Sequence, residues 1–91
     1  MKNLETLRAV LEKEKFPLPY TVKLIGKNTD AFNAGIAGFE AAHPSLTLQS
    51  RRASGGEKHL AFSYHGVMAN AEQIIEIYRS AATLPDLMVL L

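Results

Sequence analysis

The chain has 91 residues, of which 47% are hydrophobic and 21% charged, with ten basic and nine acidic side chains and no cysteine. A chain of this length forms one domain, and its composition is typical of a globular protein. The lack of cysteine excludes disulfides, thiolate catalysis and cysteine-ligated metals. The net charge of +1 argues against nucleic acid as a partner, because such binders usually carry a strong basic excess.

Membrane insertion and secretion are not expected either. The sequence has no run of 18 or more apolar residues, which a membrane-spanning helix would need. Residues 1–8 mix charges into every helical turn, unlike the hydrophobic region of a secretory signal. We therefore expect a cytoplasmic protein that does not associate with a membrane.

Residues 1–15 are expected to form an amphipathic helix in front of a main domain that covers residues 16–91. The helix should end before Pro17 and Pro19, because proline lacks an N–H and disfavours helical geometry in the residue before it. The apolar residues that recur at helical spacing within residues 3–14 are Leu4, Leu7, Val10 and Leu11.

The next two predicted elements are a strand and a helix. Residues 20–25 alternate between apolar and polar side chains, as in a strand with one buried face. Residues 28–30 offer helix-capping side chains, and His43-Pro44 ends the helix that follows. Gly35 and Gly38 each weaken this helix by roughly 1 kcal/mol relative to alanine, which indicates either close backbone approach or simple tolerance. The apolar stripe of the helix is Phe32, Ile36 and Phe39.

Two further alternating segments, residues 46–50 and 60–64, flank Gly55-Gly56 and predict a β-hairpin. A loop centred on the first glycine would place Leu48 opposite Phe62 and gather the apolar side chains on one face. A two-residue loop would split them between the two faces, because a slip of one residue reverses every side chain. We therefore expect a loop of three residues with a glycine in the left-handed region.

The last two predicted elements are a helix and a strand. Asn70 and Gln73 resemble a capping box, residues 83–85 end the helix, and residues 86–91 form the final strand. The apolar stripe of this helix is Ala71, Ile74, Ile75 and Tyr78. The predicted core of the whole domain is Val22, Leu24, Phe32, Ile36, Phe39, Leu48, Phe62, Ile75, Tyr78 and Val89.

Right-handed crossovers between these elements give an α+β, β-α-β-β-α-β two-layer sandwich. Its antiparallel sheet has the strand order 4-1-3-2, with both main helices on one face. This is the ferredoxin-like architecture, here with an extra N-terminal helix.

The sequence shows no catalytic or metal-binding pattern. His59 and His65 share a strand face but lie about 20 Å apart along it, too far to ligate one metal ion. Ser63 is close to His65 but has no acidic third partner, which an activated nucleophile needs. We therefore expect no enzymatic activity and no cofactor.

An apolar patch is expected on the face of the sheet that the main helices leave open. Ile25, Met88 and Leu90 should lie side by side there and form a candidate partner surface. An apolar patch of this kind is expected to be covered by another part of the chain or by a partner. The N-terminal helix is the simplest cover, and self-association and a protein partner are the alternatives.

Basic residues near the predicted hairpin tip offer candidate contacts to an anion. They are Arg51, Arg52 and Lys58. Together with the topology, they make a small RNA-binding domain the alternative function. The predicted register turns Phe62 and Tyr64 toward the helices and leaves no aromatic platform for stacking bases, so a solvated hairpin end is the simpler interpretation.

The segment Phe16-Pro17-Leu18-Pro19-Tyr20-Thr21-Val22-Lys23-Leu24-Ile25-Gly26 resembles the opening signature of the YbeD family of small bacterial proteins. The hairpin, the helix from Glu72-Gln73 through Tyr78 and the final Met88-Val89-Leu90 strand run in register with that family. The resemblance covers about residues 16–91. It implies a ferredoxin-like fold similar to ACT regulatory domains, in a family whose biochemical role is unassigned.

ACT domains bind small effectors, often amino acids, near their first strand-to-helix loop and at subunit interfaces. In this chain that loop contains Lys27 and Asn28, which become candidate ligand contacts, but it lacks the aspartate-x-proline-glycine run of amino-acid-binding members. The resemblance therefore implies a non-catalytic regulatory or adaptor domain that acts through protein contacts or a small-molecule effector.

Overall fold

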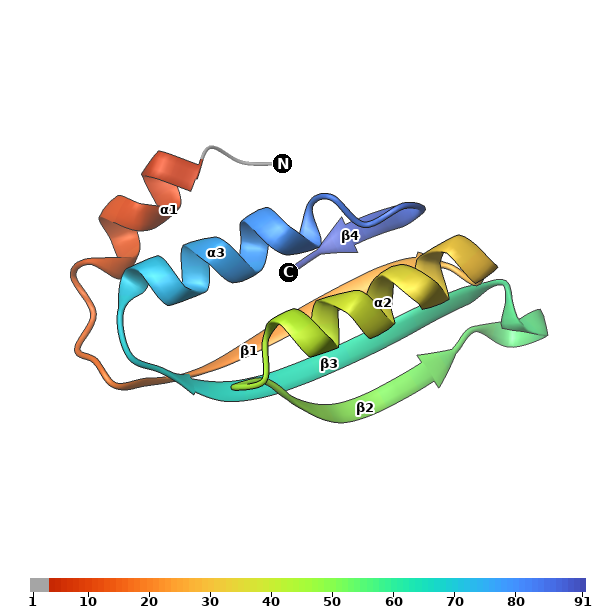
Figure 1. The fold of residues 1–91 in the computed structure, drawn as a ribbon, viewed down its shortest axis with the longest axis horizontal. Helices are drawn as coiled ribbons and strands as arrows, with labels where there is room; N and C mark the ends of the chain where they lie inside the picture. The colour runs from red at the N-terminus through yellow and green to blue at the C-terminus, as the bar shows by residue number, and fades with distance from the viewer. Residues whose placement is uncertain (1–3) are drawn as a thin grey trace.

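The computed structural model describes residues 4–91 as a four-stranded antiparallel sheet with helices on one of its faces (Figure 1). The strand order is β2-β3-β1-β4, which is the predicted order counted from the other edge. The fold is therefore α+β and ferredoxin-like. Its elements are α1 (Leu4–Leu11), β1 (Leu18–Lys27), α2 (Asp30–Ala42), β2 (Thr47–Ala53), the 3₁₀ turn η1 (Gly55–Glu57), β3 (His59–Met68), α3 (Ala71–Ala81) and β4 (Leu87–Leu90).

The two main helices begin at the predicted capping residues. The Thr29 hydroxyl accepts a hydrogen bond from the Phe32 N–H at 3.1 Å, and Asn70 Oδ1 accepts one from the Gln73 N–H at 2.9 Å. The Gln73 side chain reaches back to the Ala69 N–H at 2.7 Å. These bonds satisfy backbone donors that the first helical turn leaves without partners.

The N-terminal helix α1 lies beside α3, on the helical side of the sheet (Figure 1). It does not cover the open face, so the simplest expectation for its position is wrong. Leu11 is buried, and Leu4 and Leu7 are half-buried against the main core. The apolar stripe of α1 thus continues the helical layer instead of forming a third layer beneath the sheet.

The core fills the space between the sheet and the helices. Leu48 and Val89, predicted to be buried, are 43% and 39% exposed. Leu48 lies on the edge strand β2, and Val89 pairs with Ile25 on the face of the sheet that the helices do not cover. Tyr78 is half-buried. The predicted core residues that are buried are Val22, Leu24, Phe32, Ile36, Phe39, Phe62 and Ile75.

The hairpin between β2 and β3 has a different register from the predicted one. Leu48 pairs with Tyr64 rather than Phe62, and Arg51 pairs with Phe62. A bulge between Leu48 and Ser50 adds one residue to β2 and reverses its alternation from that point. The loop lies later in the sequence than predicted and shifts the pairing by three residues, and the bulge shifts it back by one, so Leu48 keeps the predicted face but meets Tyr64.

The hairpin loop is also longer than expected. The Ser54 N–H donates to the His59 carbonyl at 3.0 Å, so four residues lie between them instead of a three-residue loop. Gly56, with φ of 75°, provides the expected glycine in the left-handed region. Glu57 follows with φ of 53°. Two successive left-handed residues bend the chain back onto β3.

The two glycines of α2 have different environments. A Cβ on Gly35 would lie 2.9 Å from Leu84 Cδ2 and 3.2 Å from Pro85 Cδ, whereas a Cβ on Gly38 would meet nothing within 4 Å. Gly35 therefore permits the close approach of α2 to the connection between α3 and β4. Gly38 has no such packing role.

Candidate functional site

A groove of about 630 Å³ lies between α1, α3 and β4. Its walls are predominantly apolar. They include Leu4, Leu7 and Val10 from α1, Tyr78 from α3, and Met88 and Leu90 from β4.

The groove gathers some of the most exposed large apolar side chains of the described residues. Val10, Met88 and Leu91 line it and are 56%, 53% and 61% exposed. Exposed apolar side chains scattered singly are normal, but a contiguous group marks a contact surface. The groove is therefore the candidate functional site.

One residue that lines the groove, Tyr78, is held by a second tyrosine, Tyr20. The hydroxyls of Tyr20 and Tyr78 lie 2.9 Å apart, and their rings meet edge to face. Burial, aided by this hydrogen bond, raises the pKa of Tyr78, so its hydroxyl stays neutral. The Tyr78 hydroxyl thus has a hydrogen-bond partner within the protein, and the groove offers mainly apolar contact.

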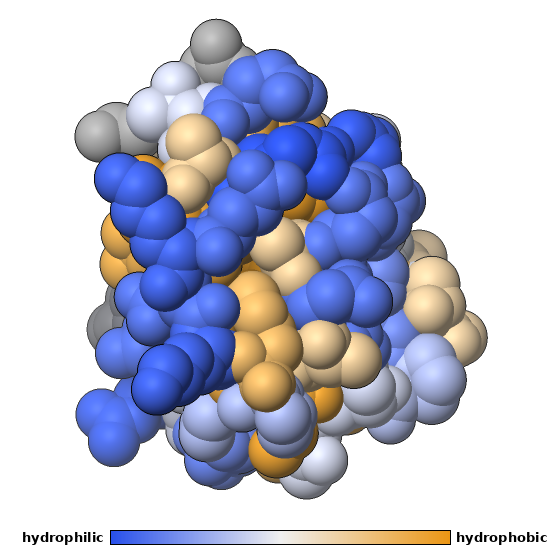
Figure 2. Space-filling view, turned by 90° about the vertical axis from the view of Figure 1, so that its left-hand side faces the viewer, coloured by the Kyte–Doolittle hydropathy of each residue, from blue (hydrophilic) through white to orange (hydrophobic). Residues whose placement is uncertain are grey.

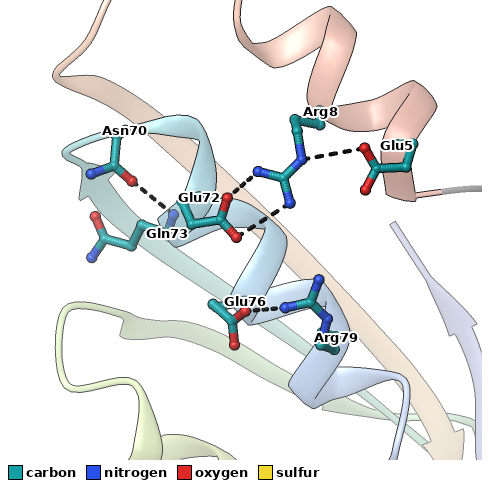
Figure 3. Close-up of polar contacts among 7 residues, drawn as sticks. All are labelled: Glu5, Arg8, Asn70, Glu72, Gln73, Glu76 and Arg79. Atoms are coloured by element: carbon teal, nitrogen blue, oxygen red, sulfur yellow. Dashed lines mark hydrogen bonds and ion pairs between the residues drawn. The ribbon is translucent and has the colours of Figure 1, made fainter.

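The α1 wall is tied to α3 by an ion pair. Arg8 contacts both carboxylate oxygens of Glu72 and also lies 3.6 Å from Glu5 (Figure 3). The guanidinium of Arg8 holds the pKa of Glu72 below its usual value. Such exposed pairs add little stability, so the burial of Leu11 is the stronger attachment.

The end of the molecule where α1 leads into β1 differs from the groove. Its surface is largely hydrophilic, with a narrow apolar strip between polar side chains (Figure 2). A smaller hollow near this end is lined by residues that include Arg8, Phe16 and Glu72. The charged side chains of Arg8 and Glu72 leave little continuous apolar surface in this smaller hollow.

Ile25, Met88 and Leu90 do not share one face of the sheet as predicted. Val89 is the residue that pairs with Ile25, whereas Leu90 pairs with the buried Leu24 and faces the helices. A bulge in the pairing of β1 with β4 makes Met88 an extra residue, and its side chain lines the groove. Met88 and Leu90 thus contribute to the groove on the helical side, while Ile25 lies on the other face.

The first strand-to-helix loop uses its polar atoms internally. The Asn28 side chain donates to the Glu57 carbonyl at 2.8 Å and accepts from Asn33 at 3.1 Å. The Lys27 N–H donates to the Asp86 carbonyl at 3.0 Å. A small effector at this loop would have to compete with these bonds.

The basic residues of the hairpin do not form one cluster. The guanidinium of Arg51 lies 5.7 Å from the centre of the Phe62 ring, on the helical side. Arg52 pairs with Ala61 on the opposite face, and Lys58 lies in the loop. The two arginines lie on opposite faces of the sheet because successive residues of a strand alternate between its faces.

The face of the sheet turned away from the helices, called here the open sheet face, carries rows of polar side chains. One row joins Thr47, His65 and Thr21, and the next joins Ser50, Ser63 and Lys23. Thr21 Oγ1 lies 3.3 Å from His65 Nδ1. Arg52, Lys27 and His59 also lie on this face.

Sequence reasoning placed Ser63, His59 and His65 on the open sheet face correctly. It overlooked Thr21 and Lys23, although their alternation with buried Val22 and Leu24 was the available signal. Ser50 and Arg52 could not be placed from the pattern, because the bulge in β2 lies before both.

The histidines do not assemble a metal site. Among residues 4–91, no group of three or more histidine or acidic side chains could hold a metal ion. His43 lies apart, with its ring centre 4.8 Å from that of Phe39, and Nε2 is buried without a hydrogen-bond partner. Burial lowers the pKa of His43. Within the same residues, no helix has the length and apolar character needed to cross a bilayer.

The fold places this chain among the ferredoxin-like α+β domains. The solved C-terminal domain of the MgtC protein from Mycobacterium tuberculosis is similar to it, with a TM-score of 0.54 and 18% sequence identity. The similarity covers 86% of this chain and 88% of that domain, and at this identity it shows the fold alone.

Residues 12–91 match the family described as a protein of unknown function, DUF493, and the chain belongs to this family. It is the same family as YbeD, which confirms the resemblance carried by the opening signature. A comparison with curated proteins found no match.

Proposed function

We propose that this protein is a non-catalytic adaptor domain that binds an extended apolar segment of a protein partner along β4. The observation that carries this proposal is that the groove lies beside an edge strand. An edge strand presents unpaired N–H and C=O groups, with which a peptide can pair as an additional strand. Every second side chain of that peptide would then enter the groove.

The dimensions of the site suit a short segment. The groove volume of about 630 Å³ falls within the range of roughly 300–1,000 Å³ that is usual for ligand sites. Strand β4 has four residues, so backbone pairing would involve a segment of similar length. The contact would be small and the binding correspondingly weak.

A small-molecule effector has less support. The resemblance to ACT domains places such a ligand near Lys27 and Asn28, where the polar atoms already bond to Asp86, Glu57 and Asn33. The groove, by contrast, is open and apolar. Protein contact is therefore the stronger of the two modes that the resemblance implies.

Peptides selected from a random display library against the full chain would test this function. We expect selected peptides with alternating apolar residues, and we expect their binding to shift the backbone amide resonances of β4 and α1. Met88→Lys should weaken binding at least tenfold, because the peptide would desolvate the new ammonium group. Val67→Lys is the matched control, since Val67 is a similarly exposed apolar residue on β3, and it should leave the affinity within twofold.

Two results would overturn the proposal. One is a set of selected peptides whose binding does not change with Met88→Lys. The other is a concentration-dependent dimer in sedimentation that Met88→Lys dissociates, because the groove would then be occupied by a second copy.

A further inference from the structure

The charges of this chain are separated between the strands and the rest of the molecule. Within residues 4–91, none of the nine acidic residues lies in a strand, whereas the strands carry four basic residues. Those four are Lys23, Lys27, Arg51 and Arg52. The net charge of +1 conceals this separation, so the distribution of charge carries information that the sum does not.

The open sheet face receives three of these basic side chains. Lys23, Lys27 and Arg52 are exposed there, and none of them forms an ion pair with any residue from 4 to 91. Arg8 and Arg79, on the helical side, are both paired with glutamates (Figure 3). The cations of the open sheet face are therefore available to an external anion.

The spacing of the three cations follows from the sheet. Lys23 and Lys27 are four residues apart on β1, a distance of about 13 Å between backbone positions. Arg52 lies two strands away, on the row of Ile25 and Ala61, which is about 12 Å from each lysine. The row between the two lysines carries Ile25 and Ala61, and the hydroxyl groups of Ser63 and Ser50 lie on the row of Lys23, with Thr21 one row further along β1.

We propose that the open sheet face binds the sugar–phosphate backbone of a single-stranded nucleic acid. Lysine, arginine, serine and threonine are the side chains that contact phosphate groups. The binding is independent of base sequence, because the large aromatic side chains of the central strands, Tyr20, Phe62 and Tyr64, pack on the helical side. Salt-dependent phosphate contacts then provide most of the affinity.

An acidic protein fits this face less well. The core of a protein interface is usually depleted of charged residues and enriched in aromatic ones. Here the two central strands carry Thr21, Lys23, Ser63 and His65 beside Ile25 and Ala61, so polar side chains outnumber apolar ones and no aromatic side chain is among them. Charge and hydroxyl content thus favour a phosphate backbone.

Fluorescence anisotropy with a labelled 20-nucleotide single-stranded RNA of mixed sequence tests the proposal on the full chain. Three phosphate contacts predict that the logarithm of the binding constant falls with the logarithm of salt concentration with a slope of about −2. Binding should therefore weaken about 20-fold between 50 and 200 mM salt. Single-stranded DNA should bind with similar affinity, because the contacts do not require the 2′-hydroxyl.

Two double variants distinguish binding at the open sheet face from a general effect of the net charge. Lys23→Gln/Arg52→Gln should reduce the slope to about −0.7, since one of the three contacts remains. Lys15→Gln/Arg79→Gln changes the net charge equally but alters residues outside the sheet, and its slope should stay near −2. Circular dichroism of each variant checks that the fold is kept.

Three outcomes would overturn the proposal. The first is no binding of RNA by 100 µM protein at 20 mM salt. The second is an equal loss of binding in the two double variants. The third is competition by a polyglutamate peptide as effective as that by unlabelled RNA, which would show that the face recognises acidic protein instead.

Discussion

The polar side chains on the helical side of the sheet and those on the open sheet face differ in their partners. On the helical side, polar groups bond to each other, as when the Tyr64 hydroxyl donates to Glu40 at 2.7 Å or Arg8 pairs with Glu72. On the open sheet face, Lys23 and Arg52 form no ion pair with the described residues. The first arrangement stabilises the fold, and the second leaves charges for a partner.

This contrast predicts that stability depends on one face of each strand much more than on the other. Phe62 is 4% exposed and packs against the rings of Phe32 and Tyr64, so Phe62→Ala should cost about 3–5 kcal/mol in free energy of unfolding. Ser63→Ala, one residue further on the open sheet face, should change it by less than about 0.5 kcal/mol. Urea denaturation of both variants measures the difference, and similar values would contradict the two-sided description.

The attachment of α1 tests whether apolar burial or ion pairing holds the helical layer together. Leu11 is 4% exposed, so Leu11→Ala should cost about 2–3 kcal/mol, with loss of amide exchange protection concentrated in α1. Glu72→Gln breaks an exposed ion pair and should have a much smaller effect on the same amides. If Glu72→Gln exposes α1 more than Leu11→Ala does, electrostatics rather than burial attaches the helix.

Substitution of two glycines, one on β1 and one on α2, probes the packing around α2. A Cβ on Gly26 would lie 2.5 Å from the ring of the fully buried Phe32, so Gly26→Ala should destabilise the protein by about 1–3 kcal/mol. Gly38→Ala meets open space on α2 and should stabilise it by up to about 1 kcal/mol. Thermal unfolding of the two variants should shift in opposite directions, and a shift of both in the same direction would contradict the packing described.

The smallest expected effect concerns pH. Burial lowers the pKa of His43 in the folded state, so the unfolded chain binds the proton more readily. The contribution of neutral His43 to the free energy of unfolding is fully present above its ordinary pKa of 6.5. It is lost as pH falls from there through the lower pKa of the folded state. Urea midpoints between pH 7.5 and 5 should therefore fall less in His43→Gln than in the unsubstituted protein.

The ion pair between Arg8 and Glu72 affects stability in a different pH range from His43, so the two effects can be distinguished. Arg8 lowers the pKa of Glu72 below 4.5, so the contribution of this carboxylate is present above 4.5 and is lost only at lower pH. Both the unsubstituted protein and His43→Gln should show that loss. A fall in stability between pH 7.5 and 5 that is identical in the two proteins would rule out His43 as its source.

Element order, helix caps and most of the core could be predicted because they depend on local pattern. Thr29 and Asn70 cap their helices as their chemistry suggests, and Phe32, Ile36 and Phe39 are buried at the expected spacing. The candidate site could not be predicted in the same way. Met88 and Leu90 reach the groove because Leu90 pairs with the buried Leu24, a register between distant segments that the pattern of the last strand does not reveal.

The sequence by itself determined the ferredoxin-like order of elements, because hydrophobic periodicity and capping act over a few neighbouring residues. Only the tertiary structure decided which side chains meet across strands and where α1 packs. Two bulges, one after Leu48 and one opposite Ile25, each reversed the alternation of an edge strand. A bulge is a property of strand pairing between distant segments, so the alternation of a single strand does not reveal it.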